Sequence, residues 1–164
     1  MALALPRFAV FQSTVRQKNY LRYIHEDGEQ HGFPQFSGEE IVSPYSKFEI
    51  ERAKSTTAEG NDNGFVHIRC CYNNKYWVAN SISSDSFIIA GADEPNEDQS
   101  QWSCTLFEPI PVDGEVGSST TTTTKTTVHV RFRHVKLGHY LRSLVTRDNY
   151  HACVSTSYDR RYSR

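Results

Sequence analysis

The sequence predicts an all-β fold built from three copies of one four-stranded unit. A pattern recurs without gaps at residues 10–21, 66–77 and 130–141. Each copy opens with Val and ends with Tyr followed by a large apolar residue, and a short polar turn precedes the Tyr. A strand, a tight turn and a second strand explain this pattern, because Asn and Gly tolerate the left-handed conformations of hairpin turns. A recurring unit of this kind is typical of a repeat architecture.

Composition and chain length agree with this fold class. The chain contains 9 Tyr, 9 Phe and 2 Trp but only 1 Met, a balance that favours strands over helices. A chain of 164 residues is most simply one domain. A helical pattern can be placed only on Glu39–Tyr45, where Pro44 argues against it. We therefore expect a single all-β domain.

The first copy, about residues 7–57, is expected to form four strands. They are Arg7–Ser13, Asn19–His25, Gln35–Ser37 and Ser46–Arg52. In the last of these, Phe48 and Ile50 alternate with Glu49 and Glu51, as in a strand with one buried face. A polar loop then ends the copy.

The second copy, about residues 64–112, repeats the same order. Its expected strands are Gly64–Cys71, Tyr76–Ser81, Phe87–Ala90 and Trp102–Pro109. Phe107-Glu108 follows Phe48-Glu49 by 59 residues. A Thr-rich, low-complexity linker at residues 113–127 then leads into the third copy, and we expect it to be mobile.

The third copy, about residues 127–164, is expected to lack its last strand. Its expected strands are Thr127–Arg133, Tyr140–Val145 and Ala152–Ser157. Adding 59 to Phe107 places the next Phe-Glu pair near position 166, and Tyr158–Arg164 shows no apolar alternation. A missing strand would leave one edge of the sheet unpaired, and three arrangements could cover it. The natural chain continues, a strand from a partner molecule pairs with the edge, or Tyr158 and Tyr162 cover part of it. We favour the last of these.

Recurring aromatic residues are expected to form the core. Tyr20, Tyr76 and Tyr140 occupy one position per copy, and Trp102 is assigned to the core with them. Trp77 follows the hairpin turn and is expected to be half exposed. The three copies are expected to superpose with Val10, Val66 and Val130 equivalent.

The charge distribution is uneven along the chain. Residues 1–124 hold 9 Lys or Arg against 17 Asp or Glu, which gives −8, and residues 125–164 hold 9 against 2, which gives +7. The acidic first two copies of one molecule can thus meet the basic third copy of another in a head-to-tail homodimer. The alternative is that these charges only keep the protein soluble. No nucleic-acid motif accompanies the scattered basic residues, so nucleic acid is not an expected partner.

Cysteine and histidine residues form no pattern of known chemistry. Cys70, Cys71, Cys104 and Cys153 fit no zinc spacing, and no nucleophile signature surrounds them, so we expect no metal, no cofactor and no catalysis. The N-terminus is a poor signal peptide and no segment has the length of a membrane span. A reduced, cytoplasmic or nucleocytoplasmic protein with buried Cys side chains is expected.

Two runs are distinctive, Ala92–Glu97 (ADEPNE) and Gln101–Phe107 (QWSCTLF), and Lys18–Tyr23 and His134–Tyr140 accompany them. In these residues, and over roughly residues 7–157, the chain resembles the amaranthin-like agglutinin domain of plants. The resemblance implies a β-trefoil lectin without catalysis or metal, in which chains pair head to tail. It also implies binding of galactose- or N-acetylgalactosamine-type glycans or glycoproteins and a role in plant stress or defence. The alternative is a protein-interaction or polyanion-binding module that has lost sugar binding.

The resemblance implies that sugar contacts come from the loop that follows the second strand of the second copy. The candidate carbohydrate-binding residues are Asn80, Ser81, Ser84, Asp85, Ser86, Phe87 and Trp77. Phe87 can offer an aromatic face to a sugar ring while its polar neighbours fix the orientation, and Trp77 is a second stacking candidate. Alternatively, Phe87 opens the third strand and points into the core. This loop contains fewer aromatic residues than the family pattern, so specificity does not follow from it.

Overall fold

The computed structural model describes residues 3–14, 19–55, 64–82, 85–112, 128–145 and 148–156. Within these ranges the chain is all-β, as predicted, and its only helical residues are Lys54 and Ser55. The strands are β1 (Phe8–Ala9), β2 (Tyr20–Tyr23), β3 (Pro34–Gly38), β4 (Phe48–Arg52), β5 (Val66–Cys70), β6 (Tyr76–Ile82), β7 (Asp85–Ala92), β8 (Phe107–Pro111), β9 (Val130–His134), β10 (Arg142–Ser143) and β11 (Val154–Ser155). The expected linker at residues 113–127 and the expected strandless tail, Tyr158–Arg164, lie outside the described residues.

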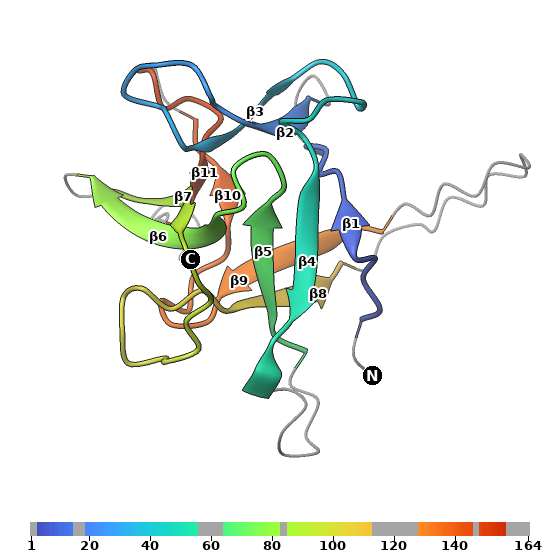
Figure 1. The fold of residues 1–164 in the computed structure, drawn as a ribbon, viewed down its shortest axis with the longest axis vertical. Coiled ribbons are helices and arrows are strands. Elements are labelled where there is room, and N and C mark those ends of the chain that lie inside the picture. The colour runs from blue at the N-terminus through green and yellow to red at the C-terminus, as the bar shows by residue number, and fades with distance from the viewer. Residues whose placement is uncertain are drawn as a thin grey trace, which may run out of the picture.

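All strand pairs are antiparallel. One sheet runs in the order β1-β4-β5-β6-β7-β11-β10, with β8 joining β5 to β9, and β2 pairs with β3 in a second sheet. Figure 1 shows β1, β4, β5, β8 and β9 together in the middle of the molecule, with the β2–β3 hairpin above them and the β6–β7 hairpin to one side. Copies are joined where the fourth strand of one pairs with the first strand of the next, in β4–β5 and β8–β9, and where the third strands β7 and β11 pair.

The hairpin turns show that the copies are structurally equivalent. Cys70 N–H donates to the Lys75 carbonyl at 2.8 Å, and 64 residues later His134 N–H donates to the His139 carbonyl at the same distance. In the first copy, Ser13 N–H donates to Asn19 O at 2.9 Å, which leaves one more residue inside the turn. The gapless alignment of the first copy is therefore wrong by one residue before the turn.

Strand pairing identifies the true equivalent of Val66. Val66 lies opposite Phe107, and Ala9 lies opposite Phe48, which occupies the same place 59 residues earlier. Ala9, not Val10, is therefore equivalent to Val66 and contacts the core, while Val10 is exposed. A one-residue slip reverses which side chains of a strand face inward, because side chains alternate across it.

Three backbone hydrogen bonds link the copies in a ring. Phe36 N–H donates to Ala152 O, Ala90 N–H to Gly32 O, and Thr156 N–H to Ser86 O, each at 2.9 Å. The donors lie at equivalent positions of the three copies, and so do the acceptors, because the same shifts of 54 and 120 residues relate both sets. The first copy donates to the third, the third to the second and the second to the first. This arrangement is consistent with a β-trefoil.

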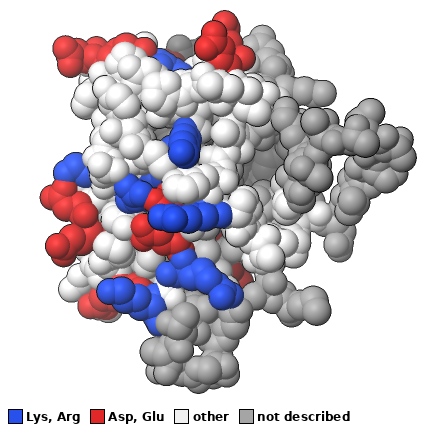
Figure 2. All heavy atoms as spheres, turned by 45° about the vertical axis from the view of Figure 1, so that its right-hand side comes forward, with Lys and Arg blue, Asp and Glu red and all other residues white. Residues whose placement is uncertain are grey.

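Cross-strand ion pairs recur at the positions of the Phe-Glu repeat. Glu49 is buried and pairs with Arg69, and Arg7 Nε donates to it at 3.0 Å. In the next copy, Arg133 Nε donates to the equivalent Glu108 at 2.9 Å. Basic and acidic side chains accordingly lie next to one another on the face shown in Figure 2, rather than in separate patches. Arg133 is thus neutralised within the molecule.

The residue that follows each recurrent Tyr contributes to the core. Leu21 and Trp77 are buried in the main cluster, and Leu141 packs against it. The expected core positions of the tyrosines are wrong: Tyr140 is exposed, and Tyr20 and Tyr76 are half-buried. A strand that buries the apolar residue after the Tyr must turn the Tyr itself away.

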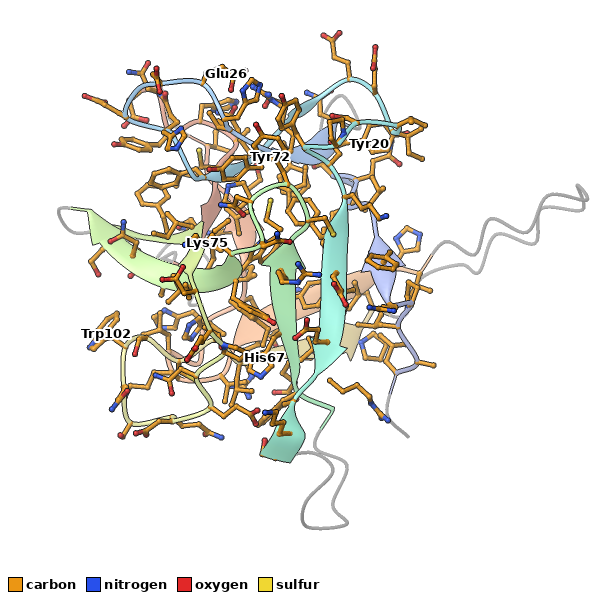
Figure 3. The ribbon with its side chains drawn as sticks, viewed as in Figure 1. Tyr20, Glu26, His67, Tyr72, Lys75 and Trp102 are labelled. Atoms are coloured by element: carbon orange, nitrogen blue, oxygen red, sulfur yellow. The ribbon has the colours of Figure 1, made fainter. Side chains whose placement is uncertain are left out.

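The two tryptophans exchange their expected environments. Trp77, expected to be half exposed, is 2% exposed and packs edge-on against Phe48 and Phe107. Trp102, expected in the core, is 59% exposed and lies at the edge of the molecule in Figure 3. The reason is that β8 begins at Phe107, so Trp102 lies in the preceding turn rather than in a strand.

Ala152 has a left-handed backbone in a loop where its equivalent, Gly32, is a glycine. Their φ values are 66° and 91°. A Cβ in this conformation is unfavourable by about 1–2 kcal/mol, part of which glycine recovers. Ala152→Gly should therefore raise the free energy of unfolding by up to about 1 kcal/mol, as measured by urea unfolding. Ala92→Gly, in the extended strand β7, should lower it by about 0.5–1 kcal/mol. Equal losses from both substitutions would contradict strain at Ala152.

The cysteines are free, as expected, and Cys70, Cys104 and Cys153 are buried while Cys71 is partly exposed. No helical segment of the described chain has the length and hydropathy that crossing a bilayer requires.

Candidate functional site

The predicted sugar-binding loop is the end of the β6–β7 hairpin. Cross-strand pairs Asn80–Phe87 and Ser81–Ser86 lead toward its tip, and Ser81 is exposed while Asn80 and Ser86 are partly exposed. Asp85 continues the strand pairing opposite Ile82, whereas Ser84 lies outside the described residues. The hairpin therefore places Ser81 opposite Ser86 on one face, while Asn80, which lies opposite Phe87, is on the other face.

Phe87 does not offer a ring face at this hairpin. It is 2% exposed and packs against Phe33 and Tyr150, with ring centroids 5.6 and 5.1 Å away. Trp77 is equally buried. The core alternative for Phe87 therefore holds, and neither ring is available to stack on a sugar.

The ADEPNE run contributes a hydrogen-bond network through its last residue, Glu97. Glu97 accepts the backbone N–H groups of Lys54 and Ser55, each at 2.9 Å, and its carboxylate lies 3.2 Å from His67 Nε2. On the other side of the same imidazole, Nδ1 lies 2.9 Å from Thr105 Oγ1. Burial raises the pKa of Glu97, but hydrogen bonds from Ser55, Lys54 and His67 outweigh it and lower the pKa to about 2. The carboxylate is thus an ionised link between the first two copies.

Burial shifts the pKa values of three thiols and of one imidazole. Burial raises the pKa of the Cys70 and Cys104 thiols, and it raises that of Cys153 to about 12, so the reactive thiolate is disfavoured. Burial lowers the pKa of His134 to about 4, while its Nδ1 accepts the Leu137 N–H at 3.1 Å. Among the described residues, no group of His, Cys, Asp and Glu is arranged to hold a metal ion.

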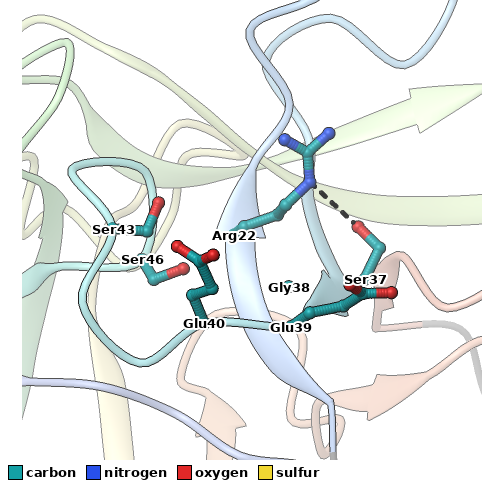
Figure 4. A pocket seen from close by; sticks show the side chains of 7 residues that line it. All are labelled: Arg22, Ser37, Gly38, Glu39, Glu40, Ser43 and Ser46. Atoms are coloured by element: carbon teal, nitrogen blue, oxygen red, sulfur yellow. Dashed lines mark hydrogen bonds between the residues drawn. The ribbon is translucent and has the colours of Figure 1, made fainter.

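A polar pocket of about 290 Å³ opens between β2, β3 and the loop that leads to β4. Its lining includes Arg22, Ser37, Gly38, Glu40, Ser43 and Ser46. We call it the Ser46 pocket. Arg22 Nε donates to Ser37 Oγ at 3.1 Å, and the Glu40 carboxylate lies between this pair and the hydroxyls of Ser43 and Ser46 (Figure 4). Sequence analysis did not single out any residue of this pocket as a binding residue.

Beside the Ser46 pocket lies a group of stacked rings. Arg22 Nη2 donates to Glu26 at 2.6 Å, and the same carboxylate oxygen lies 3.6 Å from His25. The His25 ring stacks on Tyr45 with centroids 4.0 Å apart, and Tyr72, which is 48% exposed, lies 4.6 Å from the Tyr45 ring. Figure 3 shows Tyr72 near Glu26 at the same end of the molecule.

Comparison with known proteins identifies one family. The model of the Agglutinin domain matches residues 3–159. No curated protein matches the chain.

Proposed function

The chain belongs to the Agglutinin domain family, and on that premise we propose that it is a carbohydrate-binding lectin with a β-trefoil fold. The family match over residues 3–159 carries the proposal. The ring of three hydrogen bonds between equivalent residues of the copies supports the trefoil. The family is generally non-catalytic, and the raised pKa values of the buried thiols agree with a binding role.

The proposed ligands are galactose- or N-acetylgalactosamine-type glycans, as the family resemblance implies. Asn80, Ser81 and Ser86 of the β6–β7 hairpin supply hydrogen-bonding groups, with Ser84 and Asp85 next to them in the chain. The buried Phe87 lies opposite Asn80, and Trp77 belongs to the main core cluster, so neither ring touches the sugar. A shallow, polar contact of this kind suits weak binding that gains strength when several sites act together.

We further propose that the protein acts inside the cell, in the cytoplasm or the nucleocytoplasm, in stress or defence, and as a head-to-tail homodimer. The charge difference between residues 1–124 and residues 125–164 supports such pairing. The internal Arg133–Glu108 ion pair offsets part of this charge difference. The dimer thus depends on the remaining basic residues of the third copy.

Glycan-array screening of the purified chain tests the function. We expect binding to glycans with terminal galactose or N-acetylgalactosamine, removed by the free sugar and weakened by Asn80→Ala. Binding only to heparin, lost as salt rises, would instead favour the polyanion alternative. An array without signal at high protein concentration would contradict carbohydrate binding.

A further inference from the structure

The Ser46 pocket contains a buried hydroxyl that lacks a protein partner. Ser46 is 1% exposed, and its Oγ makes no hydrogen bond to any residue that the structure describes. A buried polar atom without a partner is costly, so such a group is usually satisfied by water or a ligand. Ser46 is one of the residues that line the pocket, so a small outward movement of its side chain would present the hydroxyl to a ligand there.

In the second copy, the equivalent hydroxyl has hydrogen-bond partners within the protein. Thr105 stands two residues before Phe107, as Ser46 stands two before Phe48. Thr105 Oγ1 accepts the Asn96 N–H at 2.8 Å and lies 2.9 Å from His67 Nδ1. The hydroxyl two residues before the Phe of the Phe-Glu repeat thus has protein partners in the second copy, whereas among the described residues that of the first copy, Ser46, has none.

Gly38 keeps the space in front of Ser46 open. A Cβ at this position would come within 3.0 Å of the Tyr20 carbonyl oxygen and 3.4 Å of Ser46 Oγ. Gly38 has no left-handed φ value, so the close approach, rather than the backbone conformation, explains the glycine here. A larger residue would fill the bottom of the pocket.

The charge of the pocket favours a neutral ligand rich in hydroxyl groups. Arg22 is already paired with Glu26, and Glu39 and Glu40 add two carboxylates to the lining. An anion would meet net negative charge, whereas sugar hydroxyls can donate to the carboxylates and accept from Ser43 and Ser46. The volume of about 290 Å³ lies at the small end of ligand pockets, which suits one sugar ring.

The neighbouring rings provide the apolar half of such a site. Sugar recognition combines polar groups that fix orientation with an aromatic face that packs on the C–H groups of the ring. Glu26 links these rings to the pocket, because it accepts from Arg22 of the pocket lining and lies 3.6 Å from His25, whose ring stacks on Tyr45. Tyr72, packed on Tyr45, supplies the exposed aromatic surface that the buried Phe87 and Trp77 do not.

We propose that the Ser46 pocket, together with Tyr72, is a second carbohydrate subsite that holds one neutral hexose ring, apart from the β6–β7 hairpin. The subsite rests on the proposed lectin function. Glu40 and Ser46 bind ring hydroxyls, Tyr72 contacts the apolar face, and Gly38 provides the depth. In a longer glycan, the arrangement of hydroxyl groups on each sugar decides whether that sugar binds in the Ser46 pocket or at the β6–β7 hairpin.

The test is a titration of the ¹⁵N-labelled chain with galactose, N-acetylgalactosamine and galactose 6-sulfate, followed by amide shifts. We expect the neutral sugars to shift the Gly38, Ser43 and Ser46 amides and the sulfated sugar to bind there more weakly. Ser46→Ala and Glu40→Gln should each weaken binding at the pocket about 5- to 10-fold, the loss expected for one or two hydrogen bonds. Thr14→Ala and Glu29→Gln remove a hydroxyl and a charge from exposed positions elsewhere, and they should change nothing.

Urea unfolding separates binding from folding. Ser46→Ala should leave the midpoint unchanged or higher, because the hydroxyl makes no hydrogen bond within the described residues. Sugar binding that shifts hairpin amides but leaves the pocket amides still, with Ser46→Ala unaltered, would overturn the subsite and leave the lectin function standing. Absence of any sugar-dependent shift would overturn both.

Discussion

Phe87→Ala is expected to lower the free energy of unfolding by about 3–5 kcal/mol, the range found for truncating a buried Phe. Phe87 is fully enclosed by Phe33, Tyr150 and their neighbours, so the substitution leaves a cavity in the cluster that joins β7 to the third copy. For a chain of this size, the melting temperature should fall by about 10 °C. Urea unfolding monitored by tyrosine and tryptophan fluorescence measures the change.

Phe8→Ala is the matched control. Phe8 is exposed on β1 and contacts the cationic groups of Arg7 and Lys47, so its truncation should cost less than about 1 kcal/mol. A Phe87→Ala protein that keeps its stability and loses only glycan binding would place Phe87 at the sugar instead of in the core.

Acid should destabilise the protein in two steps. His134 is neutral when folded, with a pKa of about 4, while in the unfolded chain it titrates near 6.5. Between these values only the unfolded state takes up the proton, so roughly 3 kcal/mol of stability is lost as pH falls from 6.5 to 4. Glu97 remains ionised down to about pH 2 but protonates near 4.5 when unfolded, so its contribution is present above 4.5 and lost toward 2.

Urea unfolding at a series of pH values measures both steps. His134→Asn retains an acceptor for the Leu137 N–H and cannot titrate, so stability should no longer fall between pH 6.5 and 4. Glu97→Gln should remove the dependence below 4.5 and cost roughly 2–3 kcal/mol at pH 7. A profile in which His134→Asn and Glu97→Gln both follow the parent protein would contradict both assignments.

The alternation of apolar and polar residues predicted where the strands lie better than it predicted which of their residues face the core. Most expected strands are present, yet the recurrent tyrosines point away from the core because the adjacent Leu21, Trp77 and Leu141 take the inward positions. The pairings of β2 with β3 and of β6 with β7 each contain a register shift directly after the Tyr. Such shifts are invisible in a list of apolar residues, and they decide which side of the strand faces inward.

The first copy shows that a gapless alignment of the sequence can also miss an additional residue. Val10 and Tyr20 both match the other copies, so a gapless alignment satisfies the pattern at its two ends. The additional residue lies inside the turn, and the Ser13–Asn19 hydrogen bond and the pairing of Ala9 with Phe48 reveal it.

Candidate residues could be grouped from the sequence only where they are close in the chain. Ser81 and Ser86 are near neighbours, and the structure pairs them across the β6–β7 hairpin. The partners of Glu97, by contrast, are backbone groups more than 40 residues earlier, so the ADEPNE run could be noticed but not explained. The Ser46 pocket is defined by an unsatisfied hydroxyl, which is a property of the folded chain alone.

The central claim is that this protein binds carbohydrate without chemistry, and calorimetric titration with the strongest glycan of the array tests it most directly. The predicted result is saturable binding that persists from about 0.05 to 0.5 M NaCl, is displaced by free galactose or N-acetylgalactosamine, and leaves the glycan intact. Contacts through hydroxyl groups and aromatic faces should depend little on ionic strength, unlike those to a polyanion. No heat of binding at millimolar glycan, or cleavage of the glycan during the titration, would contradict the claim.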